Sequence, residues 1–309
     1  MTTLTTTRLP GLELLHRGKV RDVYAVDEER LLLVATDRIS AFDRVLGSPI
    51  PDKGAVLTQT SAFWFDRLQH TGPHHLLAWR AQDMPPRIAE LARGLGGRAL
   101  LVRRAEVVPV ECVVRGYLAG SVVEAYQKDG AIQGVALPPG IPLGGALPAP
   151  IFTPTTKAPQ GHDLPLTWAE LVEHVGRETA EALRARSLEL FAAASAHCRA
   201  QGLLLCDTKF ELGRLPGRGA GPLLLVDEAL TPDSSRFFEA ATHRPGTQPV
   251  PFDKQLVRDW LKAHPEVLEA EAPPVLPEEI VRQTSARYRE VFQRLSGRRL
   301  DEAVAEAVA

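Results

Sequence analysis

Two apolar segments that run into acidic residues constrain the fold of this chain more than any other feature. They span residues 203–213 and 223–236. Side chains alternate between the two faces of a strand, so Asp207, Lys209 and Glu211 are expected on one face of the first segment. The residues between the segments are rich in Gly and Pro, which predicts that the segments pair as a hairpin.

The second segment adds carboxylates to the same small surface. Asp227 and Glu228 follow its apolar run directly and are expected at the end of the partner strand. Three or four carboxylates beside one lysine repel each other unless a cation joins them. Carboxylate-lined sites suit Mg²⁺, which proteins usually share with substrate phosphates. The alternative is a solvated hairpin face that carries a simple Lys–Glu pair.

The composition is that of an ordinary globular protein and argues against several functional classes. With 309 residues, 44% of them hydrophobic, the chain can bury one large core or two smaller ones. Its net charge of −2 provides no basic field for nucleic acid or an anionic membrane. No apolar run approaches the roughly 18 residues that span a bilayer, and the N-terminus lacks the apolar core of a signal peptide. Cys112, Cys198 and Cys206 lie in apolar sequence, which predicts reduced thiols in a cytoplasmic protein.

Hydrophobic periodicity and turn residues predict a mixture of strands and helices. Strands are expected within 18–36, 99–104, 107–114 and the acidic hairpin, and helices at 55–70, 167–200, after 254 and from 277. Two sequences match a capping box, which predicts helix starts at Ser121 and Thr167. Residues 301–309 are expected to fray. Strands and helices do not alternate regularly, which favours an α+β fold.

Two groups of residues are suited to binding phosphate. Lys19 and Arg21 share a strand face just after a glycine, although the chain has no Walker A loop. Arg115 ends a strand, and Ser121 begins a helix six residues later, so an arginine lies beside the free N–H groups of a helix N-terminus. That arrangement suits a phosphate monoester, with simple capping by Ser121 as the alternative. Glu111 lies on the same strand face as Arg115 and would support a metal or orient the arginine, with a plain cross-strand ion pair as the alternative.

A long segment rich in Gly and Pro carries further candidates. Residues 134–165 contain Lys157, which would contact phosphate, and His162–Asp163, which would shuttle a proton. For that isolated pair an exposed surface loop is the simpler interpretation. Arg236, after the second acidic strand, is a candidate for another anion contact.

In their order along the chain, these motifs resemble the SAICAR synthetase family, the phosphoribosylaminoimidazole-succinocarboxamide synthases of purine biosynthesis. The stretches that carry the resemblance are Gly18–Tyr24, Val108–Arg115, Ala119–Ser121, Lys157, His162–Asp163, Asp207–Glu211 and Asp227–Arg236. Residues 251–261 resemble the longer form of the family, which has an extended C-terminus. Each motif alone is weak evidence, but the ordered set is specific.

The resemblance implies both an activity and an architecture. The activity is a C–N ligase that uses ATP to join L-aspartate to the carboxylate of the ribonucleotide CAIR, giving SAICAR, ADP and phosphate. The architecture is an α+β fold in which two subdomains with mainly antiparallel sheets flank an ATP-binding cleft. Residues 1–104 would form the ATP-binding subdomain, and residues 105–309 the subdomain with the metal and nucleotide-substrate sites. The implied partners are ATP, CAIR and aspartate, with no nucleic acid and no membrane.

The resemblance also implies roles for individual residues. The residues implied for ATP are Lys19, Arg21, Arg104 and Val108, the last two at a hinge beside the adenine. Those implied for CAIR and aspartate are Arg115, Ser121, Arg236, Lys157, Asp163, Ser40 and Asp43, with Asp37 and Lys53 as further candidates for aspartate. Mg²⁺ would be the cofactor, held by Asp207, Glu211 and Asp227. The implied catalytic residues are Lys209, beside the nucleotide substrate, and Glu111, which would fix the substrate carboxylate through metal.

The expected chemistry proceeds through an acyl phosphate. A carboxylate does not accept an amine until one of its oxygens becomes a leaving group, which transfer of the ATP γ-phosphoryl group achieves. Phosphoryl transfer needs mainly positioning and charge neutralisation, which Lys, Arg, Mg²⁺ and carboxylates supply. Two alternatives stay open at this point: a small-molecule kinase on the same ATP and Mg²⁺ site, and a non-catalytic nucleotide sensor.

Overall fold

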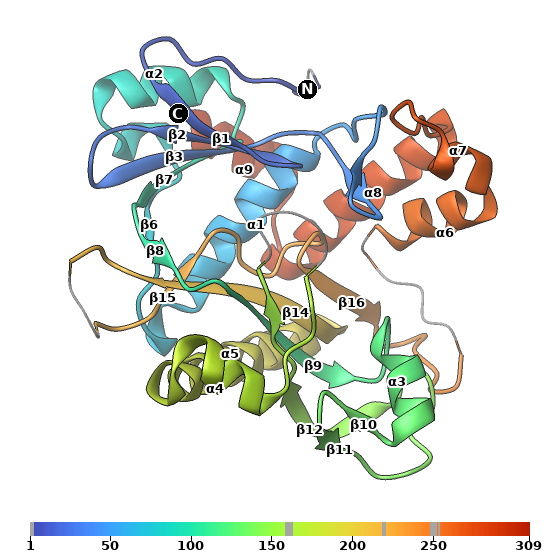
Figure 1. Ribbon diagram of the computed structural model, residues 1–309. Helices are drawn as coiled ribbons and strands as arrows, with labels where there is room; N and C mark the ends of the chain where they lie inside the picture. The colour runs from blue at the N-terminus through green and yellow to red at the C-terminus, as the bar shows by residue number, and fades with distance from the viewer. Residues whose placement is uncertain (1–2, 158–162, 218–220, 248–251, 253) are drawn as a thin grey trace.

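The computed structural model describes residues 3–157, 163–217, 221–247, 252 and 254–309 (Figure 1). The first of its two main sheets is antiparallel and has the strand order β1–β2–β3–β7–β6. Its strands are β1 (Glu13–Arg17), β2 (Arg21–Ala25), β3 (Arg30–Ala35), β7 (Ala99–Arg103) and β6 (Leu76–Ala78). Residues 26–29 turn the chain between β2 and β3, so the hairpin predicted within 18–36 is confirmed.

The second sheet is built around its longest strand, β14 (Leu203–Arg214). The strands that surround it are β8 (Glu106–Val107), β9 (Val110–Tyr117), β12 (Ala146–Phe152), β13 (Thr155–Thr156), β15 (Leu224–Val226) and β16 (Ser235–Glu239). β14 pairs antiparallel with β8, β9, β15 and β16. The predicted acidic hairpin is therefore confirmed, with Glu211 opposite Val226, the residue before Asp227.

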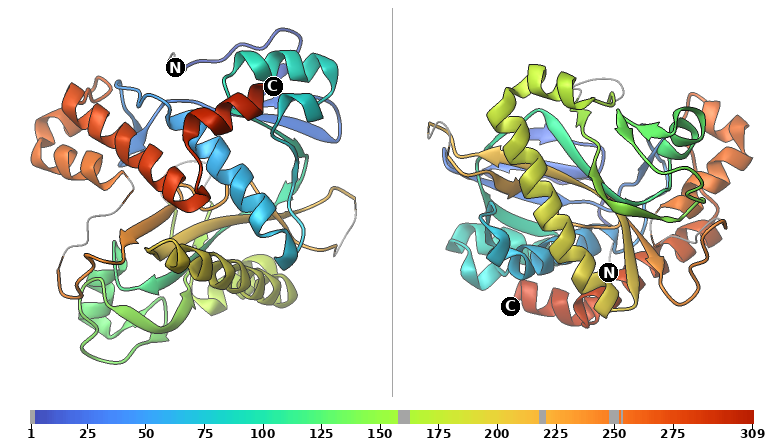
Figure 2. Two further views of the ribbon diagram at one scale, coloured as in Figure 1. Left: turned by 180° about the vertical axis from the view of Figure 1, so that it is seen from behind. Right: turned by 90° about the horizontal axis from the view of Figure 1, so that it is seen from below.

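The helices cover the sheets and fill the space between them (Figures 1 and 2). They are α1 (Lys53–Arg67), α2 (Pro86–Gly94), α3 (Val122–Asp129), α4 (Trp168–Val175), α5 (Arg177–Ala200), α6 (Gln255–Ala263), α7 (Pro265–Glu269), α8 (Glu278–Ser296) and α9 (Leu300–Val308). The remaining short elements are β4 (Ser40–Ala41), β5 (Arg44–Val45), β10 (Ala131–Ile132), β11 (Val135–Ala136) and 3₁₀ turns at Gln69–Thr71 and Ala81–Asp83. In the described part of the chain, no helix is long and apolar enough to cross a membrane.

Two helices hold the sheets in place through buried faces. α5 packs along β14, β9 and β12 and buries one stripe of its surface, including Leu183, Leu190 and Ala194. α1 packs against β3 on one side and α8 on another. A Cβ at Gly54 would lie 2.5 Å from the carbonyl oxygen of Ala35, so glycine allows the start of α1 to approach β3 this closely. The two helices thereby fix the positions of the strands that carry the charged residues.

One of the two predicted capping boxes is correct. Thr167 caps α4: its hydroxyl accepts from the backbone N–H of Glu170, whose carboxylate accepts from the N–H of Thr167. Ser121 precedes α3, but its hydroxyl makes no capping bond, so the predicted box there is wrong. The reason is conformational, because Ser121 has helical angles, φ −65° and ψ −16°, whereas a capping residue is extended.

The C-terminus does not fray as predicted. Residues 300–308 form α9, which buries Leu300, Ala303 and Ala307 against α1 and α2. The first sheet ends at Arg103 and the second begins at Glu106, so the sheets divide where the boundary at residue 104 was expected. The helices do not follow this division, because α8 and α9 from the C-terminal part pack on α1 and α2 from the N-terminal part. The two subdomains 1–104 and 105–309 therefore stay a proposal.

Candidate active site

Two cavities contain most of the predicted site residues. The smaller cavity has a volume of about 370 Å³ and is lined by residues of both sheets. Its apolar side chains include Val23, Leu31, Leu33, Val102, Val107 and Val226. The charged side chains in its lining include Lys19, Arg21, Lys157, Glu211 and Asp227. An apolar slot beside cations and carboxylates suits a flat base that carries phosphates.

Arg21 connects the two sheets at the charged part of the smaller cavity. Its guanidinium, on β2, binds Asp227 and, at 2.8 Å, Glu228, which both follow β15. Burial acts to lower the pKa of Arg21, but the two carboxylates raise it above its ordinary value. Burial acts to raise the pKa of Asp227, but Arg21, together with the charges of Lys157 and Lys209, outweighs it and holds that pKa below its usual range. Arg21 and Asp227 are therefore both charged at neutral pH.

Two lysine–carboxylate pairs lie on the neighbouring strands. Lys157, just after β13, binds Glu211, and Lys209, two residues before Glu211 on β14, binds Glu111 on β9. Burial, followed by the charge of Asp227, raises the pKa of Glu211, so these two carboxylates repel each other. Burial also raises the pKa of Glu111, with Lys209 opposing the shift. A divalent cation between Glu211 and Asp227 would relieve the repulsion, so these two donors fit Mg²⁺.

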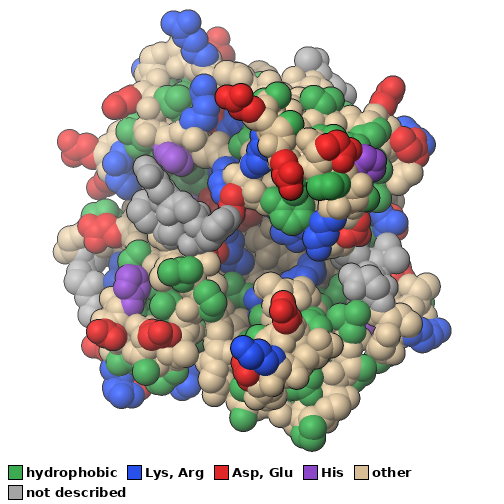
Figure 3. Space-filling model, turned by 45° about the vertical axis from the view of Figure 1, so that its right-hand side comes forward, with side chains coloured by type: hydrophobic (Ala, Val, Ile, Leu, Met, Phe, Trp, Pro, Cys, Tyr) green, Lys and Arg blue, Asp and Glu red, His purple; other side chains and the backbone are tan. Residues whose placement is uncertain are grey.

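A larger cavity, of about 750 Å³, is lined by Arg236, Ser121 and Gly120 on one side. Gly120 has φ +73°, and a Cβ there would collide with the Arg236 guanidinium, so glycine lets the backbone approach the arginine. Ser121 is exposed and precedes the N-terminus of α3. A guanidinium, a hydroxyl and free helix N–H groups suit a phosphate monoester. The face in Figure 3 is hollowed near its middle, where Lys and Arg side chains gather.

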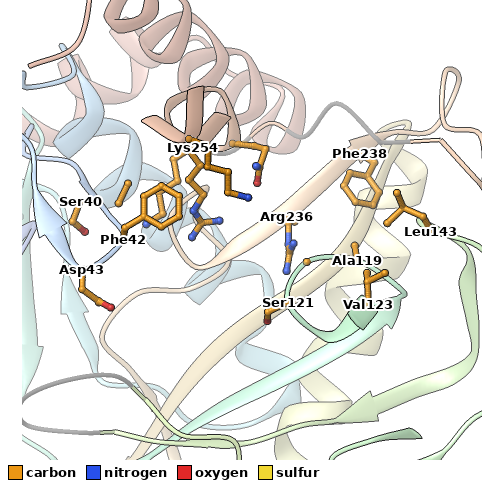
Figure 4. A pocket seen from close by; sticks show the side chains of 15 residues that line it. Ser40, Phe42, Asp43, Ala119, Ser121, Val123, Leu143, Arg236, Phe238 and Lys254 are labelled. Carbon is orange, nitrogen blue, oxygen red and sulfur yellow. The ribbon is translucent and has the colours of Figure 1, made fainter. Parts of the chain in front are cut away.

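The other side of the larger cavity combines a tight turn with a row of cations. Residues 40–43, at the turn between β4 and β5, lie together at one end of the cavity (Figure 4). Lys254, directly before α6, and Arg258 and Lys262 within it line the same cavity and recur every four residues, so they form one row along this side of the helix. Asp43 also binds Lys19 of the smaller cavity, with 2.5 Å between the charged atoms, and this ion pair links the two cavities.

Comparison with known proteins decides the family. The family model for SAICAR synthetase matches residues 14–275. The chain belongs to the SAICAR synthetase family. The phosphoribosylaminoimidazole-succinocarboxamide synthase of Halorhodospira halophila is 49% identical over 294 residues, which cover 94% of this chain and 97% of that protein. The synthase of the same name from Saccharopolyspora erythraea is 50% identical over 284 residues, covering 91% and 92%.

Solved structures agree with this membership. The SAICAR-synthase from Saccharomyces cerevisiae, solved in complex with SAICAR, has a TM-score of 0.85 and is 37% identical, covering 96% of this chain and 99% of that one. The predicted family, its α+β fold and the activity of a C–N ligase are therefore confirmed. The SAICAR synthetase family performs the ATP-dependent ligation of L-aspartate to CAIR in purine biosynthesis.

The structure does not place the side chains of the two predicted hinge residues in the lining of the smaller cavity. Arg103, Ala105 and Val107 line the smaller cavity, whereas Arg104 and Val108 do not belong to its lining. Val108 packs into the main hydrophobic core, and the Arg104 guanidinium reaches the backbone of a surface turn. Side chains alternate along this extended stretch, so an error of one residue exchanges the two faces.

The structure also separates the predicted metal ligands. Asp207 lies between two arginines: Arg115 donates to it at 3.2 Å, and Arg236 at 2.7 and 3.0 Å. Glu211 and Asp227 instead line the smaller cavity. Among the residues that the structure describes, no three His, Cys, Asp or Glu side chains form a group that could hold a metal ion. Arg115 likewise binds Asp207 and is not part of the larger cavity's lining, unlike Ser121 and Arg236.

The candidates for the aspartate pocket divide into lining and core residues. Ser40 and Asp43 line the larger cavity. Asp37 is fully buried and binds Arg98 at 3.1 Å, and Lys53 is fully buried and binds Asp233 at 2.6 Å, so both are structural here. Asp163 is exposed and lines neither cavity, and its predicted partner His162 lies outside the described residues.

The lining residues that sequence reasoning missed include Arg258, Lys262 and His75. Arg258 and Lys262 line the larger one, and their spacing of four from Lys254 was a signal that could have found them. His75 lines the smaller cavity beside Asp227, and burial lowers the pKa of its imidazole to about 3. No local motif marks His75, because only the pairing of distant segments brings it to the cavity.

Proposed function

We propose that ATP binds in the smaller cavity, that CAIR and aspartate bind in the larger one, and that the family reaction takes place where β14 connects them. One observation carries this proposal. Glu211 lines the smaller cavity, and Asp207 holds Arg236 of the larger one, with Lys209 midway between them on the same strand. Four residues of strand span about 13 Å, so β14 brings a phosphoryl donor and its acceptor to either side of Lys209.

In the smaller cavity, Lys19 and Arg21 would bind the ATP phosphates, and the backbone near Arg104 and Val108 would bind the adenine. Glu211 and Asp227 would hold Mg²⁺ together with those phosphates, because Mg²⁺ usually takes one or two carboxylates plus phosphate oxygens. The bound ion would neutralise charge on the transferred phosphoryl group. Lys157 and Arg21 are the counter-ions of these carboxylates in the structure and would turn toward phosphate.

In the larger cavity, Ser121 and Arg236 would bind the 5′-phosphate of CAIR, and Arg115 would support Arg236 through Asp207. Aspartate carries two carboxylates and an ammonium group. Lys254, Arg258 and Lys262 offer the charges that its carboxylates need, and Ser40 and Asp43 offer oxygens for the ammonium group. Asp163, which is exposed and close in sequence to Lys157, would contact the bound substrates.

The proposed chemistry has two steps that balance without further reactants. An oxygen of the CAIR carboxylate attacks the γ-phosphorus of ATP, which breaks the bond to ADP and forms an acyl phosphate. The ammonium group of aspartate first loses a proton to solvent. Its free amine then attacks the carbonyl carbon, the bond to the phosphate oxygen breaks, and the departing phosphate takes up the second proton from the nitrogen. Lys209 and Glu111 would orient the reacting carboxylate, and Lys209 would offset the negative charge that develops on it.

A coupled assay of ADP release tests this function. We expect ADP and SAICAR to accumulate together when ATP, Mg²⁺, CAIR and aspartate are all present, and neither to accumulate when CAIR is omitted. A kinase would release ADP and form a stable product from CAIR and ATP without aspartate, and a nucleotide sensor would release none. Either result would replace the ligase proposal.

We place the reaction in the cytoplasm. The three cysteines are free and buried, as expected in a reducing compartment.

A further inference from the structure

A buried ion pair joins α1, α8 and the turn that precedes β16. The side chains of Lys53 and Asp233 are 0% and 5% exposed, and 2.6 Å separates Nζ from Oδ2. The hydroxyl of Tyr288, on α8, donates to the other oxygen, Oδ1, also at 2.6 Å. The Lys53 ammonium lies 5.9 Å from the centre of the Tyr288 ring. Groups from two different helices therefore fix both oxygens of this carboxylate.

Asp233 belongs to a turn that the backbone holds rigidly. The backbone N–H groups of Ser234 and Ser235 donate to the carbonyl of Thr231 at 3.1 and 2.9 Å. The carbonyl of Ser234 accepts from the backbone N–H of Lys209 on β14 at 2.9 Å. A rigid turn moves as a unit, so the place where Asp233 is anchored also decides the position of the residues at the two ends of the turn.

Both ends of this turn reach the proposed site. At one end, the Thr231 hydroxyl donates to Glu228 at 3.0 Å, and Glu228 binds Arg21 of the smaller cavity. At the other end, three residues after Asp233, Arg236 lines the larger cavity. Along the chain, the turn thus joins Glu228, which binds Arg21, to Arg236, which is proposed to bind phosphate.

We propose that Tyr288 is a positioning residue for the CAIR site: through Asp233, its hydroxyl fixes the turn that places Arg236. This inference rests on the proposed binding of CAIR by Arg236. It assigns the C-terminal helix α8 a role in substrate binding, although the side chains of α8 do not line the larger cavity. Tyr288 acts through Asp233 and touches neither reactant.

The substitution Tyr288→Phe removes the hydroxyl and keeps the ring, its packing and the Lys53–Asp233 pair. Tyr24→Phe is a matched control. Tyr24, on β2 of the first sheet, is also almost fully buried and lines neither cavity, and its hydroxyl makes a 2.6 Å hydrogen bond with Thr7. Each variant removes one buried hydroxyl with its hydrogen bond and keeps the ring, but only Tyr288→Phe removes a contact to Asp233, so only Tyr288→Phe should affect the CAIR site.

The test is isothermal titration of each intact variant with CAIR and, separately, with ADP. We expect Tyr288→Phe to weaken CAIR binding at least about fivefold, as the loss of part of a charge-assisted contact would, with ADP binding within about twofold of wild type. We expect Tyr24→Phe to bind both ligands as wild type does. Unchanged CAIR binding in Tyr288→Phe, or equal weakening in Tyr24→Phe, would overturn the proposal. If the wild-type protein binds CAIR but releases no ADP from ATP in the presence of CAIR and aspartate, the ligase function is refuted. The comparison of CAIR binding between the variants still tests the role of Tyr288.

Discussion

Asp227 is the residue on whose charge the proposed reaction depends most. It has a left-handed backbone, φ +61°, directly after β15, and Arg21 holds its carboxylate in the ionised form. We expect Asp227→Asn to lower kcat at least about a hundredfold, because it removes a charge that would hold Mg²⁺, a loss comparable to removing one key electrostatic group. The measurement is the steady-state rate over a range of Mg²⁺ concentrations. Asp83→Asn, at an exposed ion pair with Arg80, is the control for charge alone. Near-normal turnover of Asp227→Asn at low Mg²⁺ would contradict the assignment.

Single-residue predictions from the sequence succeeded where local alternation decides the outcome. Lys209 and Glu211 project toward charged partners, as their spacing on β14 predicts. Asp207 shares that spacing but meets two arginines. β9 and β16 place Arg115 and Arg236 opposite it, beside an irregularity in the pairing with β16 that begins at Leu205. That register joins strands far apart in the chain, so no local pattern reveals it.

At the scale of elements, α6 makes a specific contribution to the larger cavity. Its row of cations faces the cavity, and we propose that Arg258 binds a carboxylate of aspartate. We expect Arg258→Ala to raise KM for aspartate about tenfold or more, the effect of losing a charged hydrogen bond, with KM for ATP little changed. Lys128→Ala, at an exposed cation on α3, is the control and should alter neither constant. Equal increases in both KM values would argue against a role in aspartate binding.

The helices also show how far an element can be predicted from its own sequence. Thr167 and Glu170 form the predicted capping box because both partners lie within one turn of the same helix. Ser121 and Glu124 have the same spacing, but Ser121 adopts helical angles between the Gly120 turn and α3. We attribute the difference to the approach of Gly120 to Arg236, a tertiary contact that overrides the local preference.

At the scale of the whole molecule, the C-terminal helices connect parts of the chain that the sequence treats separately. The sequence predicted a helix from residue 277 but a frayed end, because the short apolar pattern of residues 300–308 has no evident partner. In the structure that partner is formed by α1 and α2, more than 200 residues earlier in the chain. Lys53, expected in the aspartate pocket, is instead buried against α8 through Asp233 and Tyr288.

This buried pair predicts how stability depends on pH. Burial acts to raise the pKa of Asp233, but Lys53 and Lys254 outweigh it and hold that pKa below the unfolded value of about 3.9. The carboxylate therefore stabilises the fold fully above that value, and the contribution is lost as pH falls toward the folded pKa.

Asp233→Asn leaves Lys53 buried without its counter-charge, so at pH 7 we expect the free energy of unfolding to fall by about 3–5 kcal/mol. Urea titrations of wild type and variant at pH 7 and pH 3 measure the difference, which should shrink at pH 3. Asp83→Asn should change stability little at either pH, because that ion pair is exposed. If the difference between wild type and Asp233→Asn stays constant with pH, the charge of Asp233 does not hold these helices together, and packing of α8 on α1 alone must account for their association.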